Sequence, residues 1–462
     1  MKKSFITLAV ILASIVSCVA QQAVSYTITG LKDGKAYLSA VHGGRHDPVD
    51  SCHTLNGLIE FKNTAALPAG VYRISFEDSL FTDIIMNNEA VTMSNNMDNL
   101  LDSLKVLSSE ENKIYYDYWR MSTYINDTID MISDLGNKIY EENGHVLTPD
   151  LDSMARKTRD LSAKLDNFTN QLITRNPGLY VSKLLKAYVS PDWSAYKKTA
   201  GAKSYKSKHL FLKEHYFDHI DFSDSTLLNS EVFYVLCNDY LSRFAEPETD
   251  STYIAAIDFI LNKTQQNSPV YNYILNLFVS TFDDTEWEET FIHLVDNYLS
   301  KNTCTPSEYD RNMAERAAVL KTLKPGKKAP GIVLNDIDGK PKDLYALQAK
   351  VTLLMFWSSQ CEHCEKVMPQ IQNIYSVYHP SGLEIFAVSA DTDKKAWTDA
   401  VNKHELKWIN VSDLNGFKSP VIVAYNAYST PTFFLLDPQK NIISHPYSPK
   451  EMSEGLQKAF GK

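Results

Sequence analysis

The spacing of hydrophobic positions divides this chain into three stretches of different character. Between residues 26 and 95, short apolar or alternating runs are separated by residues that favour turns. The runs occupy residues 26–29, 36–41, 59–61, 71–76 and 84–86, and the turn residues include Gly34, Gly57 and residues 68–70. Short strands at this spacing predict a small antiparallel β-sandwich, to which we assign residues 21–96.

From about residue 97 to residue 322 the hydrophobic positions recur with helical spacing. One stripe runs from Leu100 to Ile139 and a second from Leu151 to Leu172, with an interruption at residues 142–146. Thr148-Pro149 supplies an N-cap and a proline that the first helical turn accepts. The pattern predicts a long helical hairpin followed by shorter helices. We therefore expect residues 97–322 to form an all-α domain of about nine or ten helices.

The remaining stretch, residues 323–462, alternates strands and helices after a linker at residues 321–328. Residues 351–357 form an apolar run that is typical of a strand buried on both faces, and helical spacing resumes a few residues later. Further strands are predicted at residues 332–334, 383–389, 432–436 and 441–444, and further helices at residues 394–404 and 449–460. This order predicts an α/β domain.

Composition and the N-terminus narrow the function classes. The chain has 462 residues and a formal net charge of −10, which argues against non-specific binding to nucleic acid. Met1-Lys2-Lys3 and the apolar residues 5–16 resemble a signal peptide, residues 1–20, cleaved before Gln21. Residues 15–18 alternatively fit a lipobox, which would lipidate Cys18 and anchor the protein. Both interpretations predict export to the periplasm or cell envelope, where disulfides persist.

The candidate chemistry lies just after the apolar run, at Cys361-Glu362-His363-Cys364. A cysteine at a helix N-terminus is stabilised as a thiolate, because free backbone N–H groups and the helix dipole favour negative charge there. The second sulfur lies one turn away, close enough for a reducible disulfide. A zinc site would need two further ligands, usually as a second close pair, and the other cysteines are scattered. We therefore predict a redox-active Cys361/Cys364 pair, with Cys361 as the attacking sulfur, and no metal.

The residues from Phe356 to Cys364, together with Pro369 and Tyr428-Ser429-Thr430-Pro431-Thr432, resemble thioredoxin-fold thiol–disulfide oxidoreductases of the TlpA/ResA-like branch. The resemblance covers roughly residues 325–462. It implies a thioredoxin fold, no cofactor, protein disulfides as substrates and an electron donor in the membrane. It further implies that Pro431 is a cis-proline facing the cysteine pair and leaves the backbone near Thr430 free to pair with substrate. The supporting residues would be Trp357, Glu362, His363, Thr430 and Pro431.

The two upstream regions resemble uncharacterised domains that accompany such modules in Bacteroidetes, and neither shows a catalytic constellation. The Cys52-His53 pair is interpreted as a partly exposed strand end, and Cys237 as a buried thiol. Cys304 lies in a polar loop and is kept as a possible redox partner of the pair.

Two alternatives to an exported reductant are considered. One is a peroxiredoxin-like peroxide reductase, which is disfavoured because Leu354 stands where that family has proline. The other is a cell-envelope binding protein with a vestigial redox domain. Val367 also replaces a glutamate common in the TlpA/ResA-like branch, so proton transfer at Cys364 would need another group, water or Glu365.

Overall fold

The computed structural model describes residues 23–62, 64–77, 80–100, 102–199, 202–266, 268–301 and 306–461. The predicted signal peptide, its cleavage site and Cys18 lie outside these residues, as does Cys304. The chain divides into two compact units, one holding residues up to Phe244 with Asn262–Ile274 and the other holding Ala245–Leu261 with Leu275–Lys462. None of the described helices carries an apolar stretch long enough to cross a membrane.

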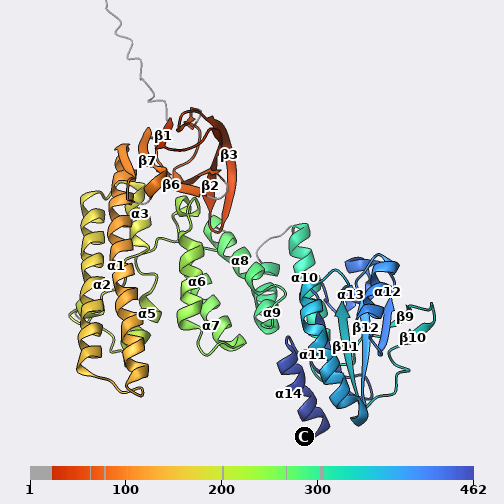
Figure 1. The fold of residues 1–462 in the computed structure, drawn as a ribbon. Coiled ribbons are helices and arrows are strands. Elements are labelled where there is room, and N and C mark those ends of the chain that lie inside the picture. Colours follow the sequence, from red (N-terminus) through yellow and green to blue (C-terminus); the bar gives the residue numbers. More distant parts are fainter. Residues whose placement is uncertain are drawn as a thin grey trace, which may run out of the picture. The chain divides into compact units, whose positions relative to one another are not determined.

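The first part of the chain is a sandwich of two four-stranded sheets, as the alternating pattern predicted (Figure 1). One sheet has the order β4-β1-β7-β8 and the other β3-β2-β5-β6. The strands are β1 (Val24–Thr29), β2 (Gly34–His42), β3 (Arg45–Thr54), β4 (Leu58–Phe61), β5 (Gly70–Phe76), β6 (Leu80–Met86), β7 (Val91–Asn96) and β8 (Lys105–Ser108). Pairing is antiparallel except between β1 and β7, which run parallel because the chain returns to the first sheet after building the second.

Strand β3 was not predicted as a whole strand, because most of its side chains are exposed to solvent. Most of its residues are exposed, so it has no hydrophobic face and no apolar alternation. Cys52 and His53 lie within this strand, where Cys52 is half-buried and His53 is exposed. They pair with Ala36 and Lys35 of β2. The two residues are therefore part of an edge strand.

Helices follow the sandwich, and the first two form the predicted hairpin. Helix α1 (Glu110–Glu142) starts at the N-cap Ser109, and α2 (Pro149–Arg175) starts at the N-cap Thr148, whose hydroxyl accepts from the N–H of Leu151. The other helices are α3 (Tyr180–Lys186), α4 (Trp193–Tyr196), α5 (Lys208–His215), α6 (Val232–Phe244), α7 (Asp250–Leu261), α8 (Pro269–Phe282), α9 (Glu288–Asn297) and α10 (Glu308–Thr322). The predicted boundaries of the three domains, after residues 20, 96 and 322, remain predictions.

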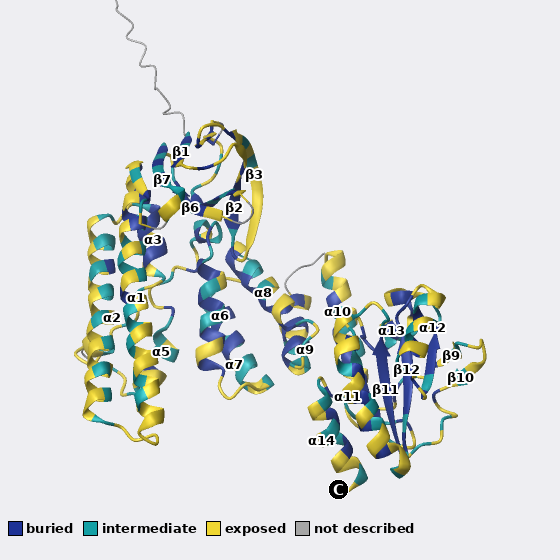
Figure 2. Cartoon of the chain, in the orientation of Figure 1, coloured by how far each residue is buried: buried dark blue, intermediate teal, exposed yellow. Residues whose placement is uncertain are grey.

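The C-terminal part is a seven-stranded mixed sheet flanked by helices. Its strand order is β10-β9-β13-β12-β11-β14-β15. The strands are β9 (Val333–Asp336), β10 (Pro341–Asp343), β11 (Val351–Trp357), β12 (Leu383–Ser389), β13 (Ile409–Ser412), β14 (Thr432–Leu436) and β15 (Ile442–Ser444). Strand β11 lies near the centre and is buried along its whole length, as its continuous apolar run predicted (Figure 2). It pairs in parallel with β12 and antiparallel with β14.

The two faces of this sheet carry different helices. Helices α11 (Glu362–Tyr378), α12 (Lys394–Lys403) and α14 (Pro449–Phe460) pack on the face formed by alternate residues of β11 from Val351 to Trp357. The opposite face, which includes Leu354, Phe356 and Phe434, packs against α13 (Pro420–Ala424) and Val319 of α10. Helix α10 therefore contributes to the second core of the thioredoxin-like domain.

Strand β13 and helix α13 of this domain were not predicted. Strand β13 is four residues long and includes Asn410 and Ser412, which are buried although polar, so hydrophobicity does not mark it. Helix α13 has only five residues, too few for a periodic pattern. The bounds of β11, β12 and α14 agree with those predicted.

Candidate active site

The site is built where strand β11 ends and helix α11 begins. The buried strand stops at Trp357, and residues 358–360 turn into the helix, whose N-cap is Cys361. The backbone N–H of Cys361 donates to the carbonyl of Ser358 at 3.2 Å, which closes this turn. In the first helical turn, the N–H of Cys364 donates to the sulfur of Cys361 at 3.1 Å. The first cysteine therefore occupies the N-terminal position that stabilises negative charge.

The two sulfurs differ in exposure and in acidity. Cys361 is half-buried, whereas Cys364 is 1% exposed, and both are free thiols. Burial opposes ionisation of Cys361, but hydrogen bonds with Cys364, with Thr430 and with backbone N–H groups outweigh it, so the pKa of this thiol is lowered. Burial first, and then the neighbouring sulfur, raises the pKa of Cys364 to about 12. Of the two sulfurs, Cys361 is therefore the one that ionises more readily.

The loop before strand β14 lies against the first sulfur. The sulfur of Cys361 is 3.1 Å from the carbonyl oxygen of Thr430, and the Thr430–Pro431 peptide bond is cis, in agreement with the family resemblance. A carbonyl accepts a hydrogen bond from a thiol, so this contact suits protonated Cys361. The N–H of Cys364 suits the thiolate instead. The site therefore offers a partner to each protonation state.

The remaining residues predicted to support the site occupy different environments. Trp357 is 2% exposed, and its indole Nε1 has no hydrogen-bond partner among the described residues. The side chains of Glu362 and His363 are both exposed on the first turn of α11. The structure thus brings Cys361, Cys364 and Thr430 together and leaves the two central residues of the motif facing solvent.

Asp391 belongs to the same turn and was not singled out from the sequence. It is 5% exposed, and its carboxylate accepts hydrogen bonds from the hydroxyls of Ser358 at 3.0 Å, Ser359 at 2.7 Å and Ser389 at 2.6 Å. The backbone N–H of Ser359 donates to both of its oxygens at 3.1 Å. Since β11 and β12 are parallel neighbours with Trp357 opposite Ser389, their carboxyl ends meet at one edge of the sheet. That rule could have identified Asp391.

Glu365, one of the groups proposed to move protons at Cys364, lies on the surface. Its carboxylate accepts a hydrogen bond from Lys403 at 2.5 Å. This contact lowers the pKa of Glu365, so the side chain is a carboxylate paired on the surface. Val367, which replaces the glutamate of the family pattern, packs against the hydrophobic core around α11. Neither residue provides a buried proton carrier.

A groove of about 370 Å³ opens beside the two cysteines. Trp357, Cys361 and Cys364 line one side, and Ala396, Ala400 and His404 from α12 and its C-terminus line the other. The arrangement combines an accessible sulfur of lowered pKa, a buried second sulfur and a loop whose backbone lies at hydrogen-bond distance. These are the parts that thiol–disulfide exchange requires.

Several chemically notable residues lie in the first compact unit, in strand β3 and helices α5 and α6. Cys52 and His53 lie in β3 of the sandwich, and Cys237 is fully buried in α6, where burial raises the pKa of its thiol. His215 pairs with Asp218 at 2.5 Å on the surface of the helical region. Over the ranges that the structure describes, no three His, Cys, Asp or Glu side chains are grouped to hold a metal ion.

Three family models match consecutive parts of the chain. Residues 325–445 match the AhpC/TSA family. Residues 202–321 and 23–115 match two domains of unknown function, DUF5106 and DUF4369 respectively. The two upstream regions, which resemble uncharacterised domains, thus match defined domain families.

Individual proteins are also similar to this chain. The chain is 35% identical to thiol-disulfide oxidoreductase ResA of Bacillus thuringiensis over 26% of its own length and 66% of that protein, just under two thirds. It is 36% identical to ResA of Bacillus cereus over 29% of its length and 77% of that protein. A thioredoxin-like protein from Bacteroides caccae aligns over 56% of this chain and 96% of its own, at 19% identity and a TM-score of 0.43. Through its C-terminal domain, the chain belongs to the ResA family of thiol–disulfide oxidoreductases.

Proposed function

We propose that this protein reduces disulfides in other proteins by exchange with the Cys361/Cys364 dithiol. The observation that carries this proposal is the asymmetry of the pair. The outer thiol is half-buried and has a lowered pKa, whereas the inner thiol is 1% exposed and has a raised pKa. An attacking thiolate must be ionised and accessible, and a resolving thiol must be held close to it.

The reaction proceeds in two exchanges. The Cys361 thiolate attacks one sulfur of the substrate disulfide, forms a mixed disulfide and releases the other substrate sulfur as a thiolate, which takes up a proton. Cys364 then loses its proton and attacks the Cys361 sulfur, which forms the intramolecular disulfide and releases the second substrate thiol. Two electrons pass from the protein to the substrate. A dithiol donor must return two electrons before the next cycle. No cofactor is needed, since each step is a sulfur-for-sulfur displacement.

The cellular setting is part of the same proposal. An N-terminal signal peptide would export the protein to the periplasm or cell envelope, with lipid attachment at Cys18 as the alternative to cleavage before Gln21. The donor there would be a membrane protein that presents reducing equivalents on the outer side. Trp357, Glu362, His363, Thr430 and Pro431 would support the pair, with Thr430 and Pro431 shaping substrate access.

A trapping experiment in the native cell envelope tests this function. In the Cys364→Ser variant the first exchange can occur but the second cannot, so mixed disulfides through Cys361 should accumulate and dissolve on reduction. The Cys361→Ser/Cys364→Ser double variant is the control and should capture nothing. Equal capture by the two variants would refute exchange through Cys361, and identification of the captured proteins would define the substrates.

A further inference from the structure

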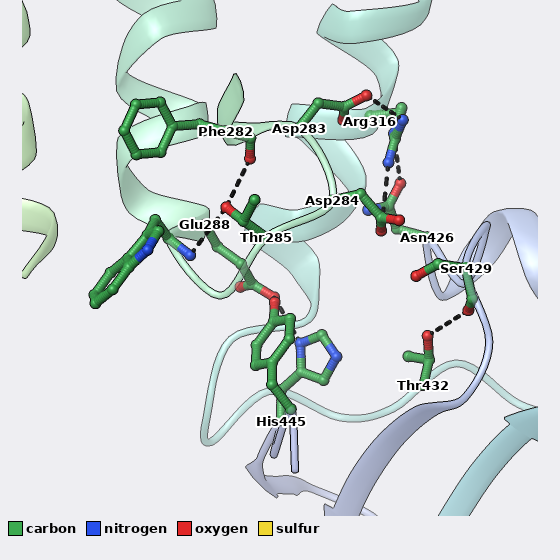
Figure 3. Close-up of polar contacts among 12 residues, drawn as sticks. Phe282, Asp283, Asp284, Thr285, Glu288, Arg316, Asn426, Ser429, Thr432 and His445 are labelled. Carbon is green, nitrogen blue, oxygen red and sulfur yellow. Dashed lines mark hydrogen bonds and ion pairs between the residues drawn. The ribbon is translucent and has the colours of Figure 1, made fainter. Parts of the chain in front are cut away.

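A charged contact connects helix α10 to the loop that carries the cis-proline. The side chain of Arg316 is only 16% exposed. Its Nη1 pairs with the Asp283 carboxylate at 2.7 Å, and its Nε donates to the Oδ1 of Asn426 at 3.0 Å (Figure 3). The guanidinium also lies 5.0 Å from the centre of the Tyr428 ring. One side chain thus joins the segment after α8 to the start of residues 426–432, which we call the cis-proline loop.

A second charged contact supports strand β14, which follows this loop, through residues beyond the strand. The Glu288 carboxylate, at the start of α9, accepts from Tyr447 at 3.0 Å and pairs with His445 at 2.6 Å and Lys324 at 3.1 Å. The ring of His445 stacks on that of Phe434, at 4.3 Å between centroids and 10° between planes. Phe434 belongs to β14, which begins directly after Pro431. Glu288 therefore supports the strand into which the loop leads.

Between these contacts the loop faces the helical segment across a small cavity. The cavity measures about 60 Å³, and Ser429, Pro431 and Thr432 line it together with Asp284 and Glu288. The hydroxyl of Thr432 donates to the carbonyl of Ser429 at 2.8 Å within the loop (Figure 3). With about 60 Å³ of free space behind it, the loop has little room to shift toward α9 and α10.

We propose that Arg316 and Glu288 are positioning residues for disulfide exchange. Arg316 holds the start of the cis-proline loop directly, at Asn426, and Glu288 supports strand β14, into which the loop leads, through His445 and Phe434. Thr430 lies inside this loop, and its carbonyl is the group that meets the Cys361 sulfur. Helical residues outside the thioredoxin fold would thereby set how a polypeptide is presented to the reactive cysteine. The inference rests on the function proposed above and assigns part of its selectivity to these two side chains.

Buried charges make this arrangement specific. Loss of Arg316 would leave the partly buried Asp283 without its cation and Asn426 without its hydrogen-bond donor. Each group would then have to move or bind water to regain a partner. Lysine cannot replace arginine here, because a single ammonium lacks the planar fork that reaches both partners at once. A substitution of Arg316 should therefore alter the position of the cis-proline loop even when the protein still folds.

The test compares two substrates in the full-length protein. Pre-reduced protein is mixed with insulin, a protein disulfide, or with dithiobis-nitrobenzoate, a small aromatic disulfide, and the Cys361-dependent second-order rate constants are measured. The small disulfide needs chiefly an accessible thiolate, whereas a polypeptide must also align along the loop. We expect Arg316→Gln to lower the insulin rate constant at least tenfold and the small-disulfide rate constant less than threefold. Glu288→Gln should likewise lower the ratio of the insulin rate constant to the small-disulfide rate constant.

Matched variants separate positioning from general damage. Arg311→Gln changes an exposed arginine of the same helix, whose Nη1 donates only to the nearby Pro306 carbonyl among the contacts described, and it should leave the ratio as in the wild type. Arg316→Lys keeps the charge toward Asp283 and should retain the fold while still lowering the insulin rate constant. Proportional losses on both substrates, or an unchanged ratio in folded Arg316→Lys and Glu288→Gln, would overturn the proposal. If wild-type protein itself reduced neither disulfide through Cys361, the proposed function would fail instead.

Discussion

The sulfur of Cys361 lies 3.1 Å from the carbonyl oxygen of Thr430, although 69 residues separate them in the chain. One belongs to the start of α11 and the other to the loop before β14. Their meeting follows from the sheet, because β11 and β14 are antiparallel neighbours with Phe356 opposite Thr432. The end of one strand therefore faces the beginning of the other, and the reactive sulfur meets the backbone at that edge.

The first prediction concerns the order in which the two thiols react. The pKa of Cys361 is lowered, so its thiolate persists to lower pH than that of an ordinary cysteine. The pKa of Cys364 is raised to about 12, so it stays protonated. Alkylation with iodoacetamide, followed by mass spectrometry across a pH series, should modify Cys361 with a midpoint below the usual value of about 8.5. Equal modification of Cys364 at neutral pH would contradict the assignment.

The second prediction concerns Asp391, which accepts hydrogen bonds from Ser358 and Ser359 in the turn before Cys361 and from Ser389 at the end of β12. Asp391→Ala would leave buried donors without an acceptor, at about 1–3 kcal/mol of unfolding free energy. Urea unfolding should show this loss. Asp399→Ala, which removes an exposed partner of Lys395 on α12, is the control and should cost about 0.5 kcal/mol or less. If the two variants were equally stable, the carboxylate of Asp391 would not be organising the turn.

The third prediction concerns proton transfer at Cys364. Glu365 is paired with Lys403 on the surface, and its lowered pKa keeps it ionised, so it is poorly suited to carry a proton to or from the buried thiol. Glu365→Gln should change the rate of the resolving step less than twofold, with no shift in its pH profile. This is measurable by following decay of a preformed mixed disulfide at Cys361. A pH-dependent loss of tenfold or more would instead make Glu365 the proton carrier.

The fourth prediction concerns independence of the C-terminal domain. A fragment of residues 323–462 should fold and reduce small disulfides, but it lacks Arg316 and Glu288 and should lose selectivity for its native partner. It also lacks Val319 of α10, which packs against the core around Leu354 and Phe434, and full burial of such a side chain contributes about 1.5–3 kcal/mol. A fragment of residues 306–462, which retains α10, should therefore melt at a higher temperature. Failure of the longer fragment to fold would show that the domain depends on more of the helical region.

The fifth prediction concerns the direction of electron flow. Glu362 and His363 face solvent, and charge effects of about 1 kcal/mol there move the potential of a two-electron couple by only about 20 mV. Family resemblance instead favours a reductant, with a potential between about −270 mV and about −120 mV and nearer the first value. Equilibration in glutathione buffers measures it, with His363→Ala as the matched variant. A value near −120 mV would make the protein a disulfide donor.

Much of the redox domain could be predicted because its strands and helices carry strong periodic signals. The uninterrupted apolar run of β11 required burial on both faces, and the motif that follows had to lie at a helix start. Strand β3 carries no such signal. It is held by backbone pairing with β2, and most of its side chains face solvent, so the hydrophobic pattern does not indicate a strand there.

The cysteine pair, its place at a helix N-terminus and the strand before it could be predicted, because each depends on residues close together in the chain. The surroundings of the pair depend instead on residues that only folding brings together. Asp391 reaches the turn of Ser358 because two parallel strands end at one edge, and Arg316 reaches Asn426 across 110 residues. Such polar contacts depend on distance and burial in the folded protein. They leave no periodic pattern in the sequence, so the residues that position the site can be identified only in the folded protein.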